Sequence, residues 1–507
     1  MKSSARKRRQ ALARWRKPAR FDRNLIVIGG GAAGLVSAYI GAAVKARVTL
    51  VEAGHMGGDC LNTGCVPSKA LIRSAALAHQ MRHAGVWGLT SAPPEIRFRQ
   101  VMARINAVIA EIAPHDSPAR YAELGVEVLA GHATLIDPWT VEITADDGSV
   151  RRLTTRAIIL ATGAAPTPPD VPGIETAGYL TTDTMWAALS DRDQVPRRIV
   201  VLGGGPVGAE LAQAFARLGS EVTLIEAGAR VLAREDAEVS DLAQAALAAD
   251  GVLVMTGRTP VACGVAGGVA GGDKWIEVEA EGIRSRIACD EIIAAVGRTP
   301  RLEGYGLEAL GIPVNRVIET NDYLETLYPN ILAAGDVAGP RQFTHVAAHQ
   351  AWYAAVNALF GLVWRFKADY RVIPRCTFLS PEIGQVGLNE QEARAQGIAF
   401  EVTRHDLRDL DRAITDGATA GFVKVLTVPR RDRILGVTIV GDHAGDLLAE
   451  FVLAMTHGLG LNKLLGTIHI YPTLAEANRH AAGAWRRAHA SRRMLRLLDR
   501  FHRWRRG

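Results

Sequence analysis

The stretch "LIVIGGGAAGLVSAYIGAAVKARVTLVE", residues 25–52, decides the fold that the sequence predicts. Residues 25–28 read as a short buried strand, three glycines follow in a GxGxxG pattern, and a helix runs to about residue 45. A second strand then ends at a glutamate. Strand, glycines, helix, strand and acid in this order are typical of a dinucleotide-binding unit, whereas the glycines alone would also suit an ordinary turn. The residues that carry this first fingerprint are Gly29, Gly31, Gly34 and Glu52.

The same pattern recurs in residues 199–226, the second fingerprint. A strand leads into three glycines, a helix runs to about residue 218, and the strand "EVTLI" ends at a glutamate. From first glycine to terminal acid the spacing is 23 residues in both copies. Two dinucleotides are therefore the simplest prediction. The residues of the second fingerprint are Gly203, Gly205, Gly208 and Glu226.

The chemistry explains these residue types. Glycines let the backbone approach a pyrophosphate at a helix N-terminus, whose partial positive charge favours an anion. Each glutamate can accept hydrogen bonds from a ribose 2′-hydroxyl. Glu226 would repel a 2′-phosphate, so NAD is favoured over NADP as the nicotinamide cofactor. Arg230 and Arg234 follow closely and could reach a phosphate, which keeps NADP open.

Two cysteines in "GGDCLNTGCVPSKAL" form the next candidate site. Cys60 and Cys65 are close enough to bridge, and Pro67 suits the first turn of a helix. Cys65 would then lie at a helix N-terminus, where the dipole lowers the pKa of a thiol, and Lys69 adds positive charge one turn later. A metal site would need more ligands than the nearby His55, so we predict none.

Length and composition set wider limits. A chain of 507 residues is long enough for three or four domains, and 48% hydrophobic residues suit an α/β protein with a large core. No run of 18 apolar residues could span a bilayer, and the basic N-terminus lacks the apolar region of a secretory signal. Five cysteines favour a reducing compartment, so we expect a cytoplasmic protein. The segment "GVAGGVAGG", residues 264–272, predicts a flexible loop.

The net charge of +7 belongs to the two ends of the chain. Residues 1–24 carry ten Lys or Arg and one Asp, residues 485–507 carry nine Arg and one Asp, and the body has a net charge of −10. The C-terminal tail also has apolar residues at helical spacing between its arginines, which predicts a basic amphipathic helix. It could pack on the body, bind a partner or lie peripherally on an anionic (inner) membrane surface. No base-reading module accompanies it, so we predict no nucleic acid partner.

Together, several motifs resemble a known family. The two fingerprints and "GGDCLNTGCVPSK" are followed by "ILATG" (159–163), "AVGRTP" (295–300) and "AAGDV" (333–337). This set is similar to the class I pyridine nucleotide-disulfide oxidoreductases, which include mercuric reductase and dihydrolipoyl dehydrogenase. The resemblance covers about residues 24–480.

The resemblance implies an α/β fold with two Rossmann-like dinucleotide-binding domains, for FAD and NAD(P), and a C-terminal α+β domain that forms a homodimer. The expected division is a basic tail (1–23), an FAD domain (24–180), an NAD(P) domain (181–300), a central part of the FAD domain (301–368), a dimerisation domain (369–484) and a basic amphipathic tail (485–507).

The resemblance also implies roles for single residues. Cys65 would face the flavin, Cys60 would meet the substrate, and Lys69 would pair with Glu210 beside the flavin. Asp336 would bind the ribityl chain of FAD. The implied cofactor-binding set is Gly29, Gly31, Gly34, Glu52, Gly58, Lys69, Gly163, Asp336, Thr344, Ala347, Gly203, Gly205, Gly208, Glu226 and Gly297.

One stretch departs from the family. Disulfide-reducing members carry His-Pro-Thr and a following glutamate in the last domain, but "HIYPTLAE" has Tyr471 before the proline. A tyrosine is a poor base at neutral pH. His469 offers a partial replacement, because residues 469 and 471 should be extended and share a face. Glu476 could assist catalysis or, in "TLAE", close a capping box with Thr473.

Mercuric reductases also lack that histidine, as the resemblance implies, but they end in a cysteine pair that is absent after Cys376 here. We therefore expect an FAD enzyme that passes electrons from NAD(P)H through Cys60 and Cys65 to a metal ion or a small thiol or disulfide acceptor, in the manner of mercuric reductase. The alternatives are a dihydrolipoyl dehydrogenase-type enzyme and a membrane-docked redox sensor or scaffold.

Overall fold

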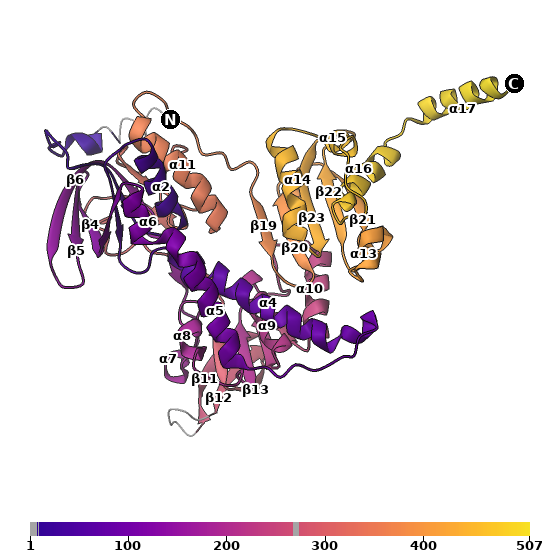
Figure 1. The fold of residues 1–507 in the computed structure, drawn as a ribbon, viewed down its shortest axis with the longest axis horizontal. Coiled ribbons are helices and arrows are strands. Elements are labelled where there is room, and N and C mark those ends of the chain that lie inside the picture. Colours follow the sequence, from indigo (N-terminus) through magenta and orange to yellow (C-terminus); the bar gives the residue numbers. More distant parts are fainter. Residues whose placement is uncertain (1–7, 9, 267–272) are drawn as a thin grey trace.

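The computed structural model describes residue 8 and residues 10–266 and 273–507. Most of the predicted glycine-rich loop, residues 267–272, lies outside the described residues. In Figure 1 the described chain forms three sheet-containing lobes, with the last one at the right of the view. None of the helices in the described ranges is long and apolar enough to cross a membrane.

A seven-stranded sheet contains the first fingerprint. Its strand β1 (Arg23–Ile28) pairs in parallel with β2 (Val48–Glu52) on one side and β6 (Val150–Leu160) on the other. Successive side chains of β1 enter different apolar clusters: Leu25 and Val27 one, Ile26 and Ile28 the other. Burial on both faces is typical of a parallel strand, and it explains the continuous apolar run in the sequence. The remaining strands are β3 (Val126–Ala130), β4 (His132–Asp137), β5 (Thr140–Thr144) and β18 (Ile331–Ala333).

Two helices from distant parts of the chain cover one face of this sheet. Helix α2 (Ala32–Ala43) follows the first glycines, and α11 (Thr344–Phe360) packs against it in the same apolar cluster. Strand β18, just before α11, joins the sheet beside β6. A late segment of the chain therefore completes the unit that the first fingerprint begins.

The N-terminal segment, predicted as a basic tail outside the body, is partly attached to it. Trp15 packs on the second apolar cluster of the sheet, and its Nε1 donates to the Tyr328 hydroxyl at 3.2 Å. Arg8 forms an ion pair with Glu325 at 3.4 Å. An indole gains from burial as long as its N–H finds an acceptor. The apolar residues of this segment are therefore partly buried against the sheet, and its boundary as a basic tail stays a prediction.

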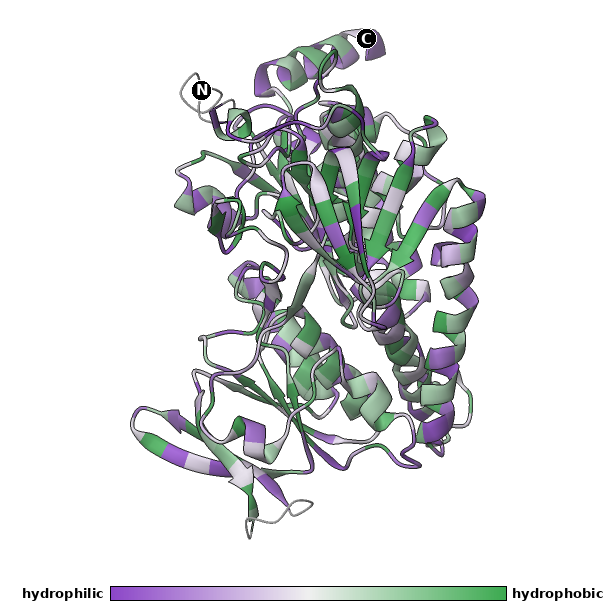
Figure 2. Ribbon diagram, turned by 90° about the vertical axis from the view of Figure 1, so that its left-hand side faces the viewer, coloured by the Kyte–Doolittle hydropathy of each residue, from purple (hydrophilic) through white to green (hydrophobic). Residues whose placement is uncertain are grey.

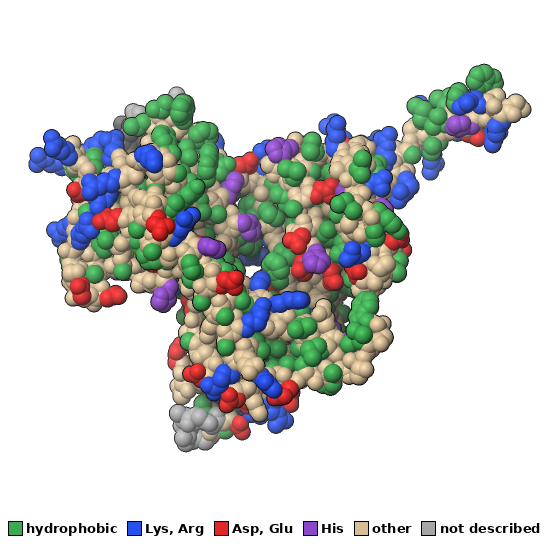
Figure 3. All heavy atoms as spheres, in the orientation of Figure 1, with side chains coloured by type: hydrophobic (Ala, Val, Ile, Leu, Met, Phe, Trp, Pro, Cys, Tyr) green, Lys and Arg blue, Asp and Glu red, His purple; other side chains and the backbone are tan. Residues whose placement is uncertain are grey.

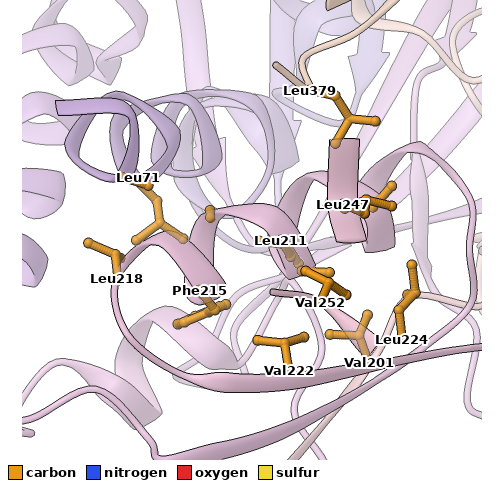
Figure 4. Close-up of a cluster of buried hydrophobic side chains, with 14 of the residues drawn as sticks. Leu71, Val201, Leu211, Phe215, Leu218, Val222, Leu224, Leu247, Val252 and Leu379 are labelled. Atoms are coloured by element: carbon orange, nitrogen blue, oxygen red, sulfur yellow. The ribbon is translucent and has the colours of Figure 1, made fainter. Parts of the chain in front are cut away.

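A four-stranded parallel sheet contains the second fingerprint. Helix α9 (Pro206–Arg217) packs on it and contributes Leu211 and Phe215 to the core in Figure 4. Leu71, from the long helix α4 (Cys65–Arg82), lies in the same core. The helix that starts at the cysteine pair thus packs against the second unit. The four strands are β8 (Arg198–Leu202), β9 (Glu221–Glu226), β10 (Leu253–Thr256) and β14 (Glu291–Ala294), with an antiparallel sheet of β11 (Thr259–Val265), β12 (Lys274–Ala280) and β13 (Ile283–Cys289) beside them.

The last lobe is an antiparallel sheet covered by helices. Its sheet has five strands, and Figure 2 shows hydrophobic residues concentrated within the sheets. The fold-class prediction, two Rossmann-like units and a C-terminal α+β domain, is confirmed. The lobe consists of β19 (Pro374–Thr377), β20 (Glu382–Gly387), β21 (Glu401–Asp406), β22 (Phe422–Thr427) and β23 (Ile434–Gly441), with α12 (Glu390–Ala395), α13 (Asp411–Thr415), α14 (Ala444–Thr456), α15 (Leu461–Leu465) and α16 (Glu476–Ala488).

The C-terminal tail forms the predicted amphipathic helix, α17 (Arg492–Arg506). Its N-terminus is capped by Ser491, whose hydroxyl accepts a hydrogen bond from the backbone N–H of Met494 at 3.3 Å. The helix projects from the lobe in Figure 1, and none of its residues is buried. Among the readings open from the sequence, packing on the body of the same chain is therefore wrong.

Candidate active site

The first fingerprint forms a tight strand-to-helix turn. Gly29 has a φ of 106°, which favours glycine, and a Cβ on Gly34 would lie 1.7 Å from the Gly29 carbonyl oxygen. At the end of β2, the Glu52 carboxylate accepts hydrogen bonds from the N–H groups of Gly30 and Gly54, the latter at 2.7 Å. The carboxylate therefore holds the turn open toward the N-terminus of α2, where an anion would bind.

The second fingerprint forms a turn of the same kind. Gly203 has a φ of 102°, and a Cβ on Gly208 would lie 1.9 Å from the Gly203 oxygen. Glu226 accepts hydrogen bonds from the N–H groups of Gly204 at 2.7 Å and Gly228 at 2.6 Å. Both predicted acids therefore stand at the end of a strand, directly against the glycine turn.

The arginines behind Glu226 have contacts of their own. The Arg230 guanidinium donates to the side-chain oxygen of Gln391, on α12, at 3.1 Å. Arg234 is exposed, and its backbone oxygen accepts a hydrogen bond from Asn389 at 2.8 Å. Neither contact involves the Glu226 carboxylate, whose hydrogen bonds are those to the glycine turn.

The two cysteines are joined by a disulfide. Cys60 lies on the short helix α3 (Gly58–Asn62), Cys65 is the first residue of α4, and their Cα atoms are 4.7 Å apart. The Sγ atom of Cys65 is 3.5 Å from the Thr344 hydroxyl at the start of α11. The prediction that Cys65 begins a helix is confirmed. A thiolate formed there by reduction would be stabilised by the helix dipole.

Lys69 and Glu210 form an ion pair between α4 and α9. The Lys69 Nζ is 2.7 Å from the Glu210 carboxylate, which is 6% exposed. The other oxygen of Glu210 accepts the N–H of Phe378 at 2.8 Å, and the Phe378 ring lies 4.6 Å from the ammonium. A buried carboxylate needs such partners to remain charged. The pair fixes the helix of the disulfide to the helix of the second fingerprint.

A cavity of about 640 Å³ connects these elements. It runs from the first glycine turn past the disulfide to the ion pair. Among the predicted site residues, those that line it are Gly29, Gly31, Glu52, Gly58, Cys60, Cys65, Lys69, Gly163, Glu210, Gly297, Asp336, Thr344 and Ala347. The residues that lie outside this lining are Gly34, Gly203, Gly205, Gly208, Glu226, His469, Tyr471 and Glu476.

Two carboxyl groups give the cavity its electrostatic character. Burial raises the pKa of Asp336 to about 6, although Arg298 opposes the shift. Burial likewise raises the pKa of Asp59, again against the effect of Arg298, which forms an ion pair with it. Arg298 begins β15 (Arg298–Pro300), the strand that carries the "AVGRTP" motif. Asp59 directly precedes Cys60, so this ion pair links that motif to the disulfide loop.

The lining fits a bound dinucleotide. A Cβ on Gly58 would lie 2.6 Å from the Gly31 Cα, so two glycines leave the backbone bare on both sides of the turn. Glu52 supplies a carboxylate for a ribose, and Asp336 supplies a second carboxyl group farther along. The volume lies within the range of natural cofactor sites.

The stretch "HIYPTLAE" places its two candidate acid/base residues in different surroundings. The His469 imidazole is almost buried, with Nε2 2.9 Å from Glu450 on α14. The Tyr471 hydroxyl donates to Asp411, on α13, at 3.0 Å, and the residue is 68% exposed. This hydrogen bond raises the pKa of Tyr471 above its usual value. The two side chains thus bind different helices, and whether His469 can act in place of the missing histidine stays a prediction.

Glu476 has a structural position. It is buried at the start of α16, and its carboxylate accepts the N–H of Thr473 at 3.4 Å. This is half of the predicted capping box. The Thr473 hydroxyl donates to the Ile470 oxygen at 2.7 Å, so the second half is not formed.

Sequence reasoning missed three residues that contact the site: Phe378, Arg298 and Asp59. Phe378 meets Glu210 from 168 positions away, and no motif in the sequence signals that contact. Arg298 and Asp59 do lie inside quoted motifs. Their opposite charges, one in each of two motifs that match the family, could have suggested that Arg298 and Asp59 form an ion pair.

The comparisons with known proteins agree with this geometry. Residues 23–351 match the sequence profile of the pyridine nucleotide-disulphide oxidoreductases, and residues 373–482 match the dimerisation domain of that family. A mercuric reductase of Bacillus cereus is 33% identical over 458 residues, covering 90% of this chain and 70% of that protein. A dihydrolipoyl dehydrogenase of Thermus scotoductus is 36% identical over 466 residues, covering 91% and 97%.

A solved structure agrees as well. The Cu(II) complex of RclA, an HOCl-induced flavoprotein disulfide reductase from Escherichia coli, superposes with a TM-score of 0.79. It is 26% identical and covers 91% of this chain and 99% of its own.

Proposed function

Because the chain belongs to the pyridine nucleotide-disulphide oxidoreductase family, and is a flavoprotein disulfide reductase with a Cys60–Cys65 redox disulfide, we propose that it passes electrons from NADH to a soft metal ion or a small electrophile. The family binds FAD and NAD(P)H. The observation that carries the proposal is Tyr471, which stands where disulfide-reducing relatives have a histidine.

The entry of electrons follows from the family chemistry. Bound FAD would supply the two-electron chemistry that links oxidation of the nicotinamide cofactor to reduction of the Cys60–Cys65 disulfide. Gly29, Gly31 and Glu52 would hold its adenosine and pyrophosphate, and Asp336 its ribityl chain. Thr344, 3.5 Å from the Cys65 sulfur, supports a position for the reacting ring beside that sulfur. Lys69 and Glu210 would then lie beside the ring where the hydride would arrive.

Reduction leaves two sulfurs that bind the acceptor. The S–S bond breaks, two electrons are taken up, and Cys65 is held as a thiolate at the N-terminus of α4. Cys60 would be the thiol that meets the substrate. Two thiolates are good ligands for a soft ion and need no added base. The family relatives include mercuric reductases, and the RclA structure is a copper complex, which supports a metal acceptor.

The acid/base residues argue against a disulfide substrate. A general acid or base contributes about 10² to 10⁴ in rate. Tyr471 is protonated at neutral pH, and its hydrogen bond to Asp411 holds it so. His469 is turned to Glu450 and almost buried. Lipoamide or glutathione disulfide would therefore turn over slowly.

The site would be completed by a second subunit. The dimerisation-domain match supports a homodimer. Ile468 and Ile470, beside Tyr471, are 96% and 78% exposed, which suits a surface that another copy covers. We propose that Tyr471 of one subunit lies near Cys60 of the other.

NAD is the proposed nicotinamide cofactor. Glu226 stands at the ribose end of the second turn, where it would accept a 2′-hydroxyl and repel a 2′-phosphate. Arg230 donates to the side-chain oxygen of Gln391, which supports a position for its guanidinium on α12 and away from the ribose. The ratio of kcat/KM for NADH and NADPH tests this preference.

The acceptor is tested by measuring NADH oxidation with Hg(II), Cu(II), lipoamide and glutathione disulfide. We expect turnover with a metal ion and little with either disulfide. Fast lipoamide turnover that His469→Ala abolishes would exclude the metal proposal. In parallel, anaerobic NADH titration should produce a flavin-thiolate charge-transfer band. That band should be lost in Cys65→Ser and retained in Cys60→Ser, and the reverse result would exchange the two thiol roles.

A redox sensor or scaffold is the second candidate, from the basic tails. The complete set of cavity, disulfide and ion pair favours an enzyme, and turnover faster than one electron pair per minute with any acceptor would exclude a purely structural role.

A further inference from the structure

A cluster of apolar side chains is exposed immediately after α11. The segment that begins at the last residue of that helix, "FGLVWRF" (360–366), turns Leu362 and Trp364 to solvent, and Leu362 is 92% exposed. Large contiguous apolar patches are uncommon on the surface of a soluble protein and usually mark an interaction site. The exposed members are Phe360, Leu362, Val363, Trp364 and Phe366. We call this segment the apolar loop.

Basic residues surround the apolar loop. Arg365 forms an ion pair with Glu325, the same carboxylate that Arg8 of the N-terminal segment contacts. Both guanidinium groups share one acid, so they leave net positive charge beside the loop. Lys367 pairs with Asp322 at 2.9 Å and lies against Tyr323. The loop therefore has the composition of a membrane-interface segment, with a tryptophan and basic residues beside aliphatic ones.

Helix α17 has the same combination on a regular surface. At 3.6 residues per turn, most of its large apolar residues fall on one side and most of its arginines on the other, while Leu495 falls at the border and Arg505 on the apolar side. Trp504, on the apolar side, is 77% exposed. The single acid, Asp499, pairs with Arg503 at 2.8 Å. The apolar side consists of Met494, Leu497, Leu498, Phe501 and Trp504, and the basic side of Arg492, Arg493, Arg496, Arg500, Arg503 and Arg506.

The two elements lie far apart along the molecule in Figure 1 but on the same, upper side of it. The N-terminal segment, which shares Glu325 with the apolar loop, and α17 appear at the upper edge in Figure 1 and again in Figure 2, which is turned by 90°. Figure 3 shows hydrophobic and basic side chains together on α17. A flat surface could therefore contact both elements at once.

We propose that this side of the molecule, which carries the apolar loop and α17, docks on the surface of an anionic lipid bilayer. The arginines of α17 match the charge of anionic headgroups, and its apolar side and Trp364 would enter the interface. The described helices include none that spans a bilayer, so the contact is peripheral. The inference is independent of the acceptor proposed above, because neither element lines the cavity.

The test is co-sedimentation of the full-length, flavin-loaded protein with vesicles. Vesicles of phosphatidylcholine alone are compared with vesicles that also contain phosphatidylglycerol, at low and at high salt. We expect binding to the mixed vesicles, weakened by salt, and little binding to phosphatidylcholine. Near an anionic surface each arginine strengthens binding by roughly fivefold, so Arg493→Glu with Arg500→Glu should reduce it by more than tenfold.

Two further variants test the apolar contributions without changing charge. Leu362→Ser with Trp364→Ser alters the loop, and Phe501→Ser with Trp504→Ser alters the helix. The matched control is Ile283→Ser, at an isoleucine that is 68% exposed on β13, far from both elements in Figure 1. Each test pair should reduce binding several-fold and the control should not. Flavin content and NADH oxidation should be unchanged in all three.

Several results would overturn the proposal. It fails if the unaltered protein does not bind the mixed vesicles, if phosphatidylcholine vesicles bind as well, or if the control loses as much binding as the test pairs. It also fails if the loop or helix variants convert dimer to monomer in size-exclusion chromatography with light scattering, because a second copy of the chain would then be what covers this surface.

Discussion

The two fingerprints have nearly the same local geometry and very different surroundings. Their first glycines have φ values of 106° and 102°, and their terminal acids accept hydrogen bonds from equivalent backbone groups. Gly29 and Gly31 line the 640 Å³ cavity with the disulfide, whereas Gly203 and Gly205 lie outside that lining. Residues from β18 to α11 line the cavity beside the first turn, whereas Val207 of the second fingerprint lines it and the three glycines of that fingerprint do not.

This difference in surroundings distinguishes a turn that can bind a nucleotide from a turn that also retains it. A glycine turn at a helix N-terminus provides a pyrophosphate site wherever it occurs. Whether the nucleotide stays bound depends on how much of it the remaining chain buries. We therefore expect a tightly held cofactor at the first turn and an exchangeable one at the second.

The largest effect should come from filling the turns. In Gly34→Val a side chain would start 1.7 Å from the Gly29 oxygen, and in Gly208→Val 1.9 Å from the Gly203 oxygen. Gly34→Val should purify without flavin and without activity. Gly208→Val should keep its flavin and lose NADH oxidation by at least about 10³-fold, because only nicotinamide binding is disrupted. Flavin absorbance and stopped-flow reduction measure both.

Alanine at the same positions tests the steric cause. Its Cβ meets the same oxygen, so Gly34→Ala should still lose most of the flavin. Gly31→Ala should lose less, because its Cβ would lie 3.7 Å from the Gly58 Cα, which is an ordinary contact distance. Loss of flavin from Gly208→Val would contradict the separation of the two sites.

The next effect concerns the ion pair that joins the two units. Lys69→Ala leaves the Glu210 carboxylate buried with only the Phe378 N–H as a partner. We expect flavin reduction to slow by about 10²-fold and the free energy of unfolding to fall by about 3 kcal/mol. Rapid-reaction kinetics and urea titration measure these changes. Lys69→Arg should restore much of the stability, and a variant with unaltered kinetics would show that the pair only fastens the helices.

A smaller effect should distinguish the two acids. Glu226→Ser removes a charged acceptor for the ribose, which is worth about 1.5 to 3 kcal/mol, so kcat/KM for NADH should fall by about 10- to 100-fold. The value for NADPH should rise or stay the same. Glu52→Ser should leave the NADH to NADPH ratio unchanged, and a shift in that control would mean that the first turn also contacts the nicotinamide cofactor.

The smallest effect is the pH dependence of the cavity. Because burial raises the pKa of Asp336 to about 6, the folded state binds its proton more tightly than the unfolded state. This contribution is present below the unfolded pKa and is lost as the pH rises through about 6. Relative to Asp336→Asn, flavin-free wild-type protein should therefore lose about 1 to 2 kcal/mol between about pH 4 and about pH 7. Urea titration at both pH values measures the free energy of unfolding. If it changes equally with pH in the two proteins, Asp336 is not the source of the pH dependence.

Much of the architecture could be predicted because it depends on local patterns. Strand, glycine turn and helix follow one another within about 30 residues, and the cysteine pair is separated by four residues. The contact between Lys69 and Glu210, 141 positions apart, was available only from the family resemblance. The domain boundaries and the roles of the site residues stay predictions.

The remaining features depend on contacts that no local pattern encodes. His469 and Tyr471 were expected on one face, but their hydrogen-bond partners, Glu450 and Asp411, lie on different helices. Trp15 lies in the predicted basic tail, and no local pattern signals its contact with Tyr328, which is 313 positions away. In both cases the side chain contacts its partner only once the lobe that contains both residues has folded.

The place of β18 has a consequence for the order in which the chain can fold during synthesis. Strand β6 is not fully paired until Ile331–Ala333 have been made, and the N-terminal segment waits for Tyr328. The second sheet needs only residues 198–294 and closes earlier. We therefore expect the nicotinamide unit to fold during synthesis before the flavin unit, although synthesis of the flavin unit begins first. Cofactor capture would then be one of the last steps of its biogenesis.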